Sequence, residues 1–180
     1  MTAPRVLIAG AFGQGNPGDQ SVLDAFVSHL EGCRVSATVA RDPTPGTVGY
    51  RPVPSGNRRA VAAEVLSADL TVATATVFKT LHPASGRSPL GLLGSTLGVA
   101  LAARLSGRPL AMAGVGAGRL DHPAAPLLAR AVAATAGSVE VRDEESAAML
   151  QAAGVRRPLP VGADVVWKEH TSELQSPMYL

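Results

Sequence analysis

Residues 6–23, VLIAGAFGQGNPGDQSVL, contain the pattern from which the fold of this chain is predicted. An apolar run leads into four glycines between positions 10 and 18, and a segment with helical spacing begins near Asp19. This order predicts a buried strand, a turn in which glycine permits positive φ, and a helix whose free N–H groups face that turn. A corner of this kind can bind a ligand.

The rest of the chain alternates between apolar strands and helices in the same way. Further strands are predicted over 35–40, 69–76, 109–115, 139–141 and 159–161, and helices over 20–30, 59–66, 94–106, 122–136 and 144–153. Strands that are apolar along their whole length indicate a parallel sheet covered on both faces. We therefore expect an α/β domain with a doubly wound, mostly parallel, Rossmann-like sheet, which binds ligands beyond the carboxyl ends of its strands.

The segments between these elements differ in length and composition. Residues 41–57 are rich in proline and glycine and are interpreted as a loop. Residues 77–92 form a long polar excursion, which favours a functional loop. The domain is expected to span residues 1–167, and residues 168–180 are expected to be an irregular tail of truncated or foreign sequence.

The composition argues against several classes of protein. Of the 180 residues, 46% are hydrophobic, which is typical of a globular chain, and the formal net charge is only +2. The arginines form no stripe interleaved with aromatic residues, so no nucleic acid partner is expected. Cys33 is the single cysteine, which excludes a disulfide framework and a thiolate metal site and suits the cytoplasm. The longest apolar stretch, 90–105, is interrupted by glycines and polar residues and is too short for a membrane span.

Residues 13–18, GQGNPG, match the dinucleotide fingerprint G-x-G-x-x-G, and Asp42 follows the second predicted strand. Asp19 opposes this interpretation, because its carboxylate would repel a pyrophosphate at the helix N-terminus, and Pro17 lacks one N–H donor. We interpret Asn16 or Asp19 as the helix cap, with the glycine backbone close to a neutral or sugar-like ligand. A tight turn without a ligand and a nucleotide-binding Rossmann domain remain alternatives.

Cationic side chains follow later strands at the same predicted edge of the sheet. Lys79, His82 and Arg87 lie in the polar excursion, and their chemistry suits a phosphate dianion or a carboxylate. Arg142 comes directly after a strand and is a candidate ligand contact, whereas the acidic residues after it suit a helix N-terminus. Asp164 follows the last predicted strand in a similar way.

Five segments, taken in their order, carry a resemblance to a known family. They are NPGDQSVL (16–23), FKTLHPASGR (78–87), GRPLAMAGVGAG (107–118), VEVRDEESAAMLQAAG (139–154) and VGAD (161–164). Together they resemble the polysaccharide pyruvyl transferase family, and the resemblance covers nearly all of residues 5–164.

This resemblance implies a glycosyltransferase-B-like arrangement of two Rossmann-like halves, of which this chain would be the N-terminal half. It implies transfer of enolpyruvate from phosphoenolpyruvate to a sugar hydroxyl as a ketal, in exopolysaccharide or cell wall glycan biosynthesis. The acceptor would be a glycan or a nucleotide- or lipid-linked sugar, and no cofactor beyond the phosphoenolpyruvate donor is expected. The Arg-Leu-His segment of the family's C-terminal half has no counterpart here, so this chain alone is expected to be inactive.

The resemblance and the strand ends together give a set of candidate site residues. His82 is the candidate catalytic acid or base. The residues expected to bind substrate are Gly13, Gly15, Asn16, Asp19, Lys79, Arg87, Gly116, Arg142 and Asp164.

One departure from the family pattern favours a second hypothesis. Members of the family tend to have three glycines after the third strand, where this chain has Ala73-Thr74-Ala75. The β-carbons of these alanines are expected to obstruct close backbone approach and to resist positive φ. A non-catalytic binding or assembly module of the same fold is therefore an alternative to an enzyme.

Overall fold

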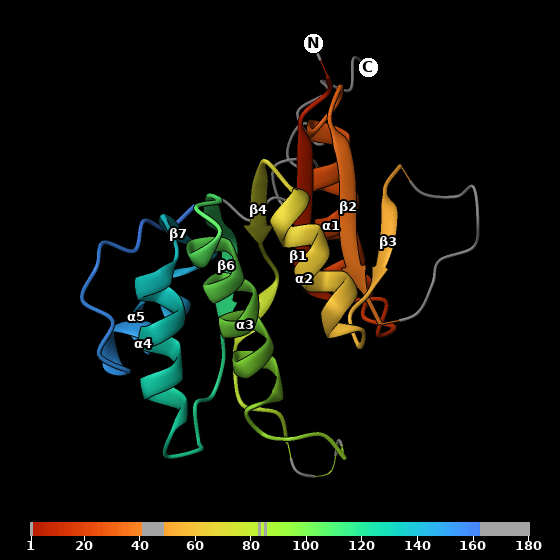
Figure 1. Cartoon of the computed structure of the whole chain (residues 1–180). Helices are drawn as coiled ribbons and strands as arrows, with labels where there is room; N and C mark the ends of the chain where they lie inside the picture. The colour runs from red at the N-terminus through yellow and green to blue at the C-terminus, as the bar shows by residue number, and fades with distance from the viewer. Residues whose placement is uncertain (1, 41–48, 83, 85, 163–180) are drawn as a thin grey trace, which may run out of the picture.

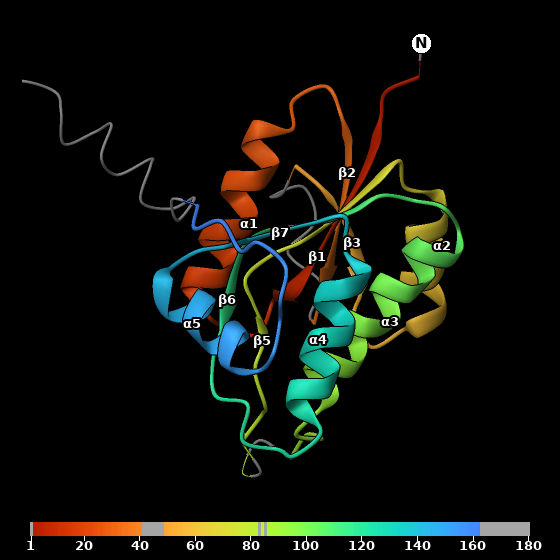
Figure 2. The ribbon, with the colours of Figure 1, turned by 90° about the vertical axis from the view of Figure 1, so that its left-hand side faces the viewer.

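The computed structural model of the protein describes residues 2–40, 49–82, 84 and 86–162. Within these residues, seven parallel strands form one sheet, and five helices cover it (Figure 1). Helices α2, α3 and α4 lie on one face and helices α1 and α5 on the other, as the rotated view shows (Figure 2). The expected doubly wound α/β fold is confirmed.

The elements alternate along the chain as a doubly wound fold requires. The strands are β1 (Arg5–Phe12), β2 (Arg34–Val39), β3 (Arg51–Pro54), β4 (Leu70–Ala73), β5 (Thr76–Phe78), β6 (Leu110–Ala117) and β7 (Ser138–Val141). The helices are α1 (Pro17–His29), α2 (Arg58–Ser67), α3 (Gly91–Leu105), α4 (Ala125–Thr135) and α5 (Glu144–Ala152).

The strand order is β3-β2-β1-β4-β6, with β7 on the far side of β6. Strand β4 pairs with the first residues of β6, Leu110–Met112. Strand β5 pairs with the last residues of β6, Gly116 and Ala117. The direction of winding therefore reverses between β1 and β4, which is the position where doubly wound sheets form a ligand crevice. All strands are parallel, so their carboxyl ends lie at one edge, here called the carboxyl edge, and their amino ends at the opposite amino edge.

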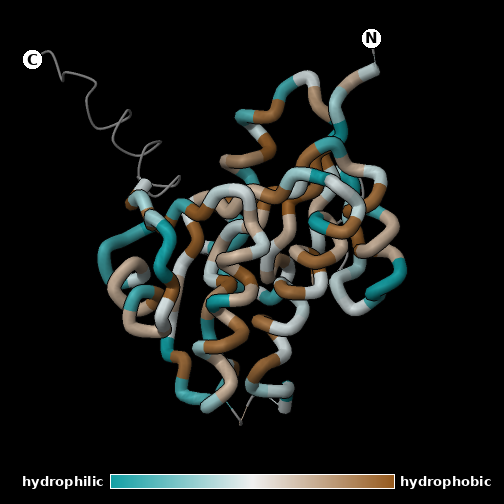
Figure 3. Tube along the Cα trace, turned by 60° about the vertical axis from the view of Figure 1, so that its left-hand side comes forward, coloured by the Kyte–Doolittle hydropathy of each residue, from teal (hydrophilic) through white to brown (hydrophobic). Residues whose placement is uncertain are grey.

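The core consists of two buried clusters. The larger cluster contains Leu7 and residues of α2, α3 and α4, and it also includes residues of α5 on the other face. Neighbouring side chains of a strand point to opposite faces, and Ile8, next to Leu7, packs with Phe12 and Leu23 under α1. Hydrophobic residues, brown in Figure 3, run through the middle of the molecule. This arrangement explains why the strands are apolar on both faces.

Side-chain caps begin three of the helices. Asn16 accepts a hydrogen bond from the N–H of Gly18 at 3.2 Å, Asn57 from that of Ala60 at 3.1 Å, and Asp143 from that of Ser146 at 2.7 Å. Each bond satisfies an N–H group that has no partner within its helix. The interpretation of Asn16 as the cap of α1 is confirmed.

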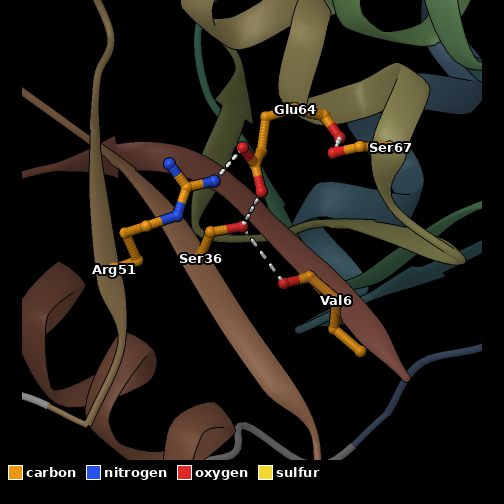
Figure 4. Close-up of polar contacts among 5 residues, drawn as sticks. All are labelled: Val6, Ser36, Arg51, Glu64 and Ser67. Carbon is orange, nitrogen blue, oxygen red and sulfur yellow. Dashed lines mark hydrogen bonds and ion pairs between the residues drawn. The ribbon is translucent and has the colours of Figure 1, made fainter. Parts of the chain in front are cut away.

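A polar cluster joins α2 to the second strand (Figure 4). The hydroxyl of Ser36, which is 4% exposed, donates to Oε1 of Glu64 at 2.9 Å, and Arg51 forms an ion pair with the other carboxylate oxygen. Burial raises the pKa of Glu64, but hydrogen bonds from Arg51 and Ser36 and the charges of Arg51 and Arg5 outweigh it and hold the pKa below its ordinary value. The cluster therefore fixes α2 over β2 and β3.

The structure corrects several predicted boundaries. Residues 51–54, predicted as loop, form β3, because Val53 is buried beside β2; residues 41–48 lie outside the described residues. The polar excursion begins only after β5, and α3 begins at Gly91. Strand β6 ends at Ala117, two residues beyond the predicted strand over 109–115. The last predicted strand is reduced to a single bridge between Val161 and Val141.

The predicted strand over 69–76 is divided into β4 and β5 by Thr74 and Ala75. Ala75 adopts a φ of +64° although its β-carbon resists positive φ. That conformation costs about 1–2 kcal/mol in a residue other than glycine. The methyl group is buried in the cluster under α1, and burial of one such carbon returns about 0.8 kcal/mol. The backbone therefore makes the turn without glycine.

Candidate functional site

The carboxyl edge on both sides of the winding reversal is formed by the residues that follow β1 and β4. Gly13 and Gly15 have φ values of +72° and +82°, as their position in the predicted turn requires. Beside them, the N–H of Thr74 donates to the carbonyl of Ala9, and the N–H of Gly116 donates to that of Ala75. The glycine corner and the Ala75 turn therefore lie on adjacent strand ends.

Arg87 connects the polar excursion to the glycine corner. Its Nη1 donates to Oε1 of Gln14 at 2.7 Å, and both side chains are exposed. The loop after β5 thus crosses the winding reversal, and its guanidinium group lies beside the glycine corner. Gln14 was not predicted as a site residue.

Arg142 lies where β7 ends and reaches back toward β5. Its Nε donates to Oδ2 of Asp143 at 2.8 Å, and its Nη1 lies 3.5 Å from the hydroxyl of Thr76. A β-carbon at Gly116 would lie 3.0 Å from Cζ of Arg142 and 3.1 Å from Oγ1 of Thr76. Gly116 is thus a strand residue whose missing side chain leaves room for the guanidinium. The side chain of Arg142 is 41% exposed, so an anion can reach it.

Asp143 and Ser146 fix the backbone around Arg142. The hydroxyl of Ser146, which is 1% exposed, accepts a hydrogen bond from the N–H of Ala117 at 2.9 Å. Hydrogen bonds from Ser146 lower the pKa of Asp143; burial opposes them, and the neighbouring Arg142 lowers the pKa further. Asp143 is therefore held as a carboxylate that caps α5 and orients Arg142. Only a capping role was predicted for Asp143, and the contact between Ser146 and β6 was missed because it joins residues 29 positions apart.

Lys79 and His82 are placed by the same loop. Lys79 directly follows β5, and its Cβ lies 3.3 Å from the position that a β-carbon on Gly118 would occupy. Thr80 attaches the loop to the end of β6, because its hydroxyl donates to the carbonyl of Arg119 at 2.8 Å. His82 is exposed, and its Nδ1 accepts a hydrogen bond from the N–H of Ala84 at 3.2 Å. That bond leaves Nε2 as the ring atom available to a ligand.

The structure brings the predicted residues together only in part. Arg87 meets the corner that contains Gly13 and Gly15, and Arg142 meets Gly116. Asn16 and Asp19 bind each other instead, since Nδ2 of Asn16 donates to Oδ2 of Asp19 at 2.8 Å, so both serve the start of α1. Asp164 and Asp42 lie outside the described residues.

The described residues contain neither a metal-binding cluster nor a membrane-spanning helix. No group of three or more His, Cys, Asp or Glu side chains in this part of the chain is arranged to hold a metal ion. None of the helices in the described ranges is long and apolar enough to cross a membrane.

The likeness to one solved structure, HepE, supports the fold. HepE from Anabaena, in complex with UDP, has a TM-score of 0.56 at 16% identity, and the match covers 89% of this chain and 44% of HepE. A uronate dehydrogenase mutant from Agrobacterium tumefaciens, complexed with NAD, has a TM-score of 0.49 at 16% identity, covering 96% of this chain and 83% of the other. The chain thus spans less than half the length of HepE. No curated protein matches the sequence.

Comparison with family models identifies the sequence relationship. The model of polysaccharide pyruvyl transferases matches residues 76–178, more than half of the chain. The matched region includes the loop with Lys79, His82 and Arg87, and it includes Arg142. The protein belongs to the polysaccharide pyruvyl transferase family.

Proposed function

We propose that the carboxyl edge binds an anionic substrate of pyruvyl transfer, with phosphoenolpyruvate as the donor. The observation that carries this proposal is the position of Arg142, an accessible guanidinium held by Asp143 and Thr76 over Gly116. A guanidinium binds the paired oxygens of a carboxylate or a phosphate with two parallel hydrogen bonds. Arg87 and Lys79 lie on the adjoining loop and add positive charge at the same edge.

The chemistry requires cations of this kind. Ketal formation joins C2 of the enolpyruvate to two sugar oxygens, converts its methylene to a methyl group and releases phosphate. One hydroxyl proton balances the new methyl group and the other balances the departing phosphate. Fixed positive charge near the phosphate stabilises the charge that develops as this group leaves. In the proposal, Arg142 and Arg87 supply that charge, and Nε2 of His82 exchanges a proton with the sugar hydroxyl or the methylene carbon.

In this proposal the described residues form one side of the site. The family resemblance implies a second Rossmann-like half, and this chain spans 44% of HepE. We therefore assign binding of one substrate to the carboxyl edge and expect complete turnover to need groups from a second domain. The aligned structure of HepE contains UDP, which favours a nucleotide-linked sugar as the second candidate ligand of this edge.

Titration calorimetry of the 180-residue chain with phosphoenolpyruvate and, separately, with UDP tests the proposal. The Arg142→Ala variant should weaken binding of the true ligand by roughly ten-fold or more, since a charged hydrogen bond is lost. Arg130→Ala, which removes an exposed arginine of α4, is the matched control and should bind like the unmodified chain. Binding of UDP alone would assign the edge to the acceptor, and absence of binding to either compound would support the non-catalytic module.

A further inference from the structure

The amino edge of the sheet, opposite the site, combines positive charge with exposed leucines. Four arginines and two leucines form what is here called the amino-edge surface: Arg5, Arg34, Arg104, Arg108, Leu66 and Leu105. All six side chains are exposed. They come from the starts of strands β1 and β2, the residues just before β6, and the ends of helices α2 and α3.

A depression of about 290 Å³ brings the charged part of this surface together. Three of the arginines, Arg5, Arg34 and Arg108, line it with Asp69. Asp69 accepts a hydrogen bond from the backbone N–H of Arg5 at 2.9 Å and lies 3.6 Å from Nη1 of Arg108. A single carboxylate among three guanidinium groups leaves an excess of positive charge in the depression.

The leucines lie beside the depression rather than across the molecule from it. Helices α2 and α3 are neighbours on one face, and both end at the amino edge (Figure 1). Leu66 is 52% exposed and precedes Ser67, which lines the depression, and Leu105 is 86% exposed and lies three residues before Arg108. Leu101, one turn before Leu105, is 43% exposed on the same side of α3.

We propose that the amino-edge surface docks this protein on an anionic phospholipid bilayer. Arginines bind lipid phosphates, and leucines beside them enter the boundary between headgroups and acyl chains. A nucleic acid would engage the arginines but leave the leucines in water. A second copy of the chain would place like charges against each other, so charge complementarity favours the anionic lipid surface.

Docking in this orientation is compatible with an open site. The eight residues of β1 separate the two edges by about 26 Å, at about 3.3 Å per residue. The carboxyl edge therefore faces away from the bilayer, where a glycan carried at some distance from its lipid can reach it. The docking proposal itself does not rest on the proposed activity.

Vesicle flotation tests the proposal with the 180-residue chain. Vesicles that contain phosphatidylglycerol should bind the chain, and vesicles of phosphatidylcholine alone should not. Replacement of Arg5 and Arg34 together by serine should lower the partition coefficient by roughly thirty-fold. The matched control replaces Arg58 and Arg59 by serine; both residues are exposed and lie at the opposite end of α2. This variant should have a partition coefficient within about two-fold of that of the unmodified chain.

The leucines have their own matched control. The double variant Leu66→Ser and Leu105→Ser should reduce partitioning, whereas Leu127→Ser, at a 60% exposed leucine near the start of α4, should not. Circular dichroism melting confirms that each variant is folded. Equal binding to neutral vesicles, or no binding to either kind, overturns the proposal. Two further results would overturn the proposal in favour of another partner. One is binding of single-stranded RNA that is equally strong in the unmodified chain and in the leucine variant. The other is a dimer of the unmodified chain, seen in sedimentation without lipid, that the leucine variant no longer forms.

Discussion

Nη1 of Arg87 donates to Oε1 of Gln14 at 2.7 Å, although the two residues are 73 positions apart. This bond joins the loop after β5 to the turn after β1, on either side of the point where the winding of the sheet reverses. The loop that contains His82 is therefore attached to the first βα unit at the candidate site.

Replacement of Gln14 by alanine should loosen this loop. The lost bond is exposed and is worth about 1 kcal/mol, so local opening should increase roughly five-fold. Limited trypsin digestion at Lys79 and Arg87, followed by mass spectrometry, measures that opening. Gln151→Ala, which removes an exposed glutamine side chain of α5, is the control, and equal cleavage in the two variants would contradict the prediction.

Ser146→Ala should destabilise the fold more than a serine substitution on the surface. It removes the acceptor of the buried N–H of Ala117, and an unsatisfied buried donor costs about 1–3 kcal/mol. Urea unfolding measures the loss. Ser95→Ala is the control, because Ser95 is exposed and its hydroxyl donates to the carbonyl of Leu92 in its own helix. Equal losses in the two variants would disprove a special role for Ser146.

The two alanines of the 73–75 turn should respond differently to glycine. Ala75→Gly relieves a backbone strain of about 1–2 kcal/mol at φ +64°. This gain offsets the lost burial of the methyl group and the greater freedom of the unfolded chain, so the free energy of unfolding should change little. Ala73→Gly, in β4, has no such strain to relieve and should cost about 1 kcal/mol or more. Chemical denaturation of both variants compares them, and a larger loss at Ala75 would show that its conformation is unstrained.

The cluster around Glu64 should make stability depend on pH (Figure 4). The pKa of Glu64 is lower in the folded protein than its ordinary value of 4.5, so the folded state binds this proton more weakly than the unfolded state. The resulting stabilisation is present above pH 4.5 and is lost as the pH falls through the lowered folded pKa. Because Arg51 is largely exposed, the stabilisation amounts to about 1 kcal/mol.

A comparison of Glu64→Gln with the unmodified chain isolates this effect. The difference in free energy of unfolding should shrink between pH 7 and pH 3, as measured by urea titration. Glu145→Gln removes an exposed carboxylate of α5 and controls for the general effect of lost charge. A difference that is constant with pH would show that the ion pair contributes nothing.

The sequence by itself determined the alternation of strands and helices, the parallel sheet and the start of α1. Local chemistry is sufficient for these features: apolar runs form buried strands, Gly13 and Gly15 permit the positive φ of the turn, and Asn16 caps the helix. The sequence also indicated that Arg142 lies at a strand end. The short strand β3 was missed because its pairing with β2 does not show in the local pattern of residues 51–54.

The tertiary structure decided which side chains meet at the carboxyl edge. The contacts of Arg87 with Gln14 and of Arg142 with Thr76 join residues 73 and 66 positions apart, and their geometry depends on strand order and register rather than on local propensity. The same is true of Gly116, whose missing side chain matters only because Arg142 lies over it. At Ala75, burial of the methyl group overrides the preference for glycine, because packing energy from the whole fold offsets local backbone strain.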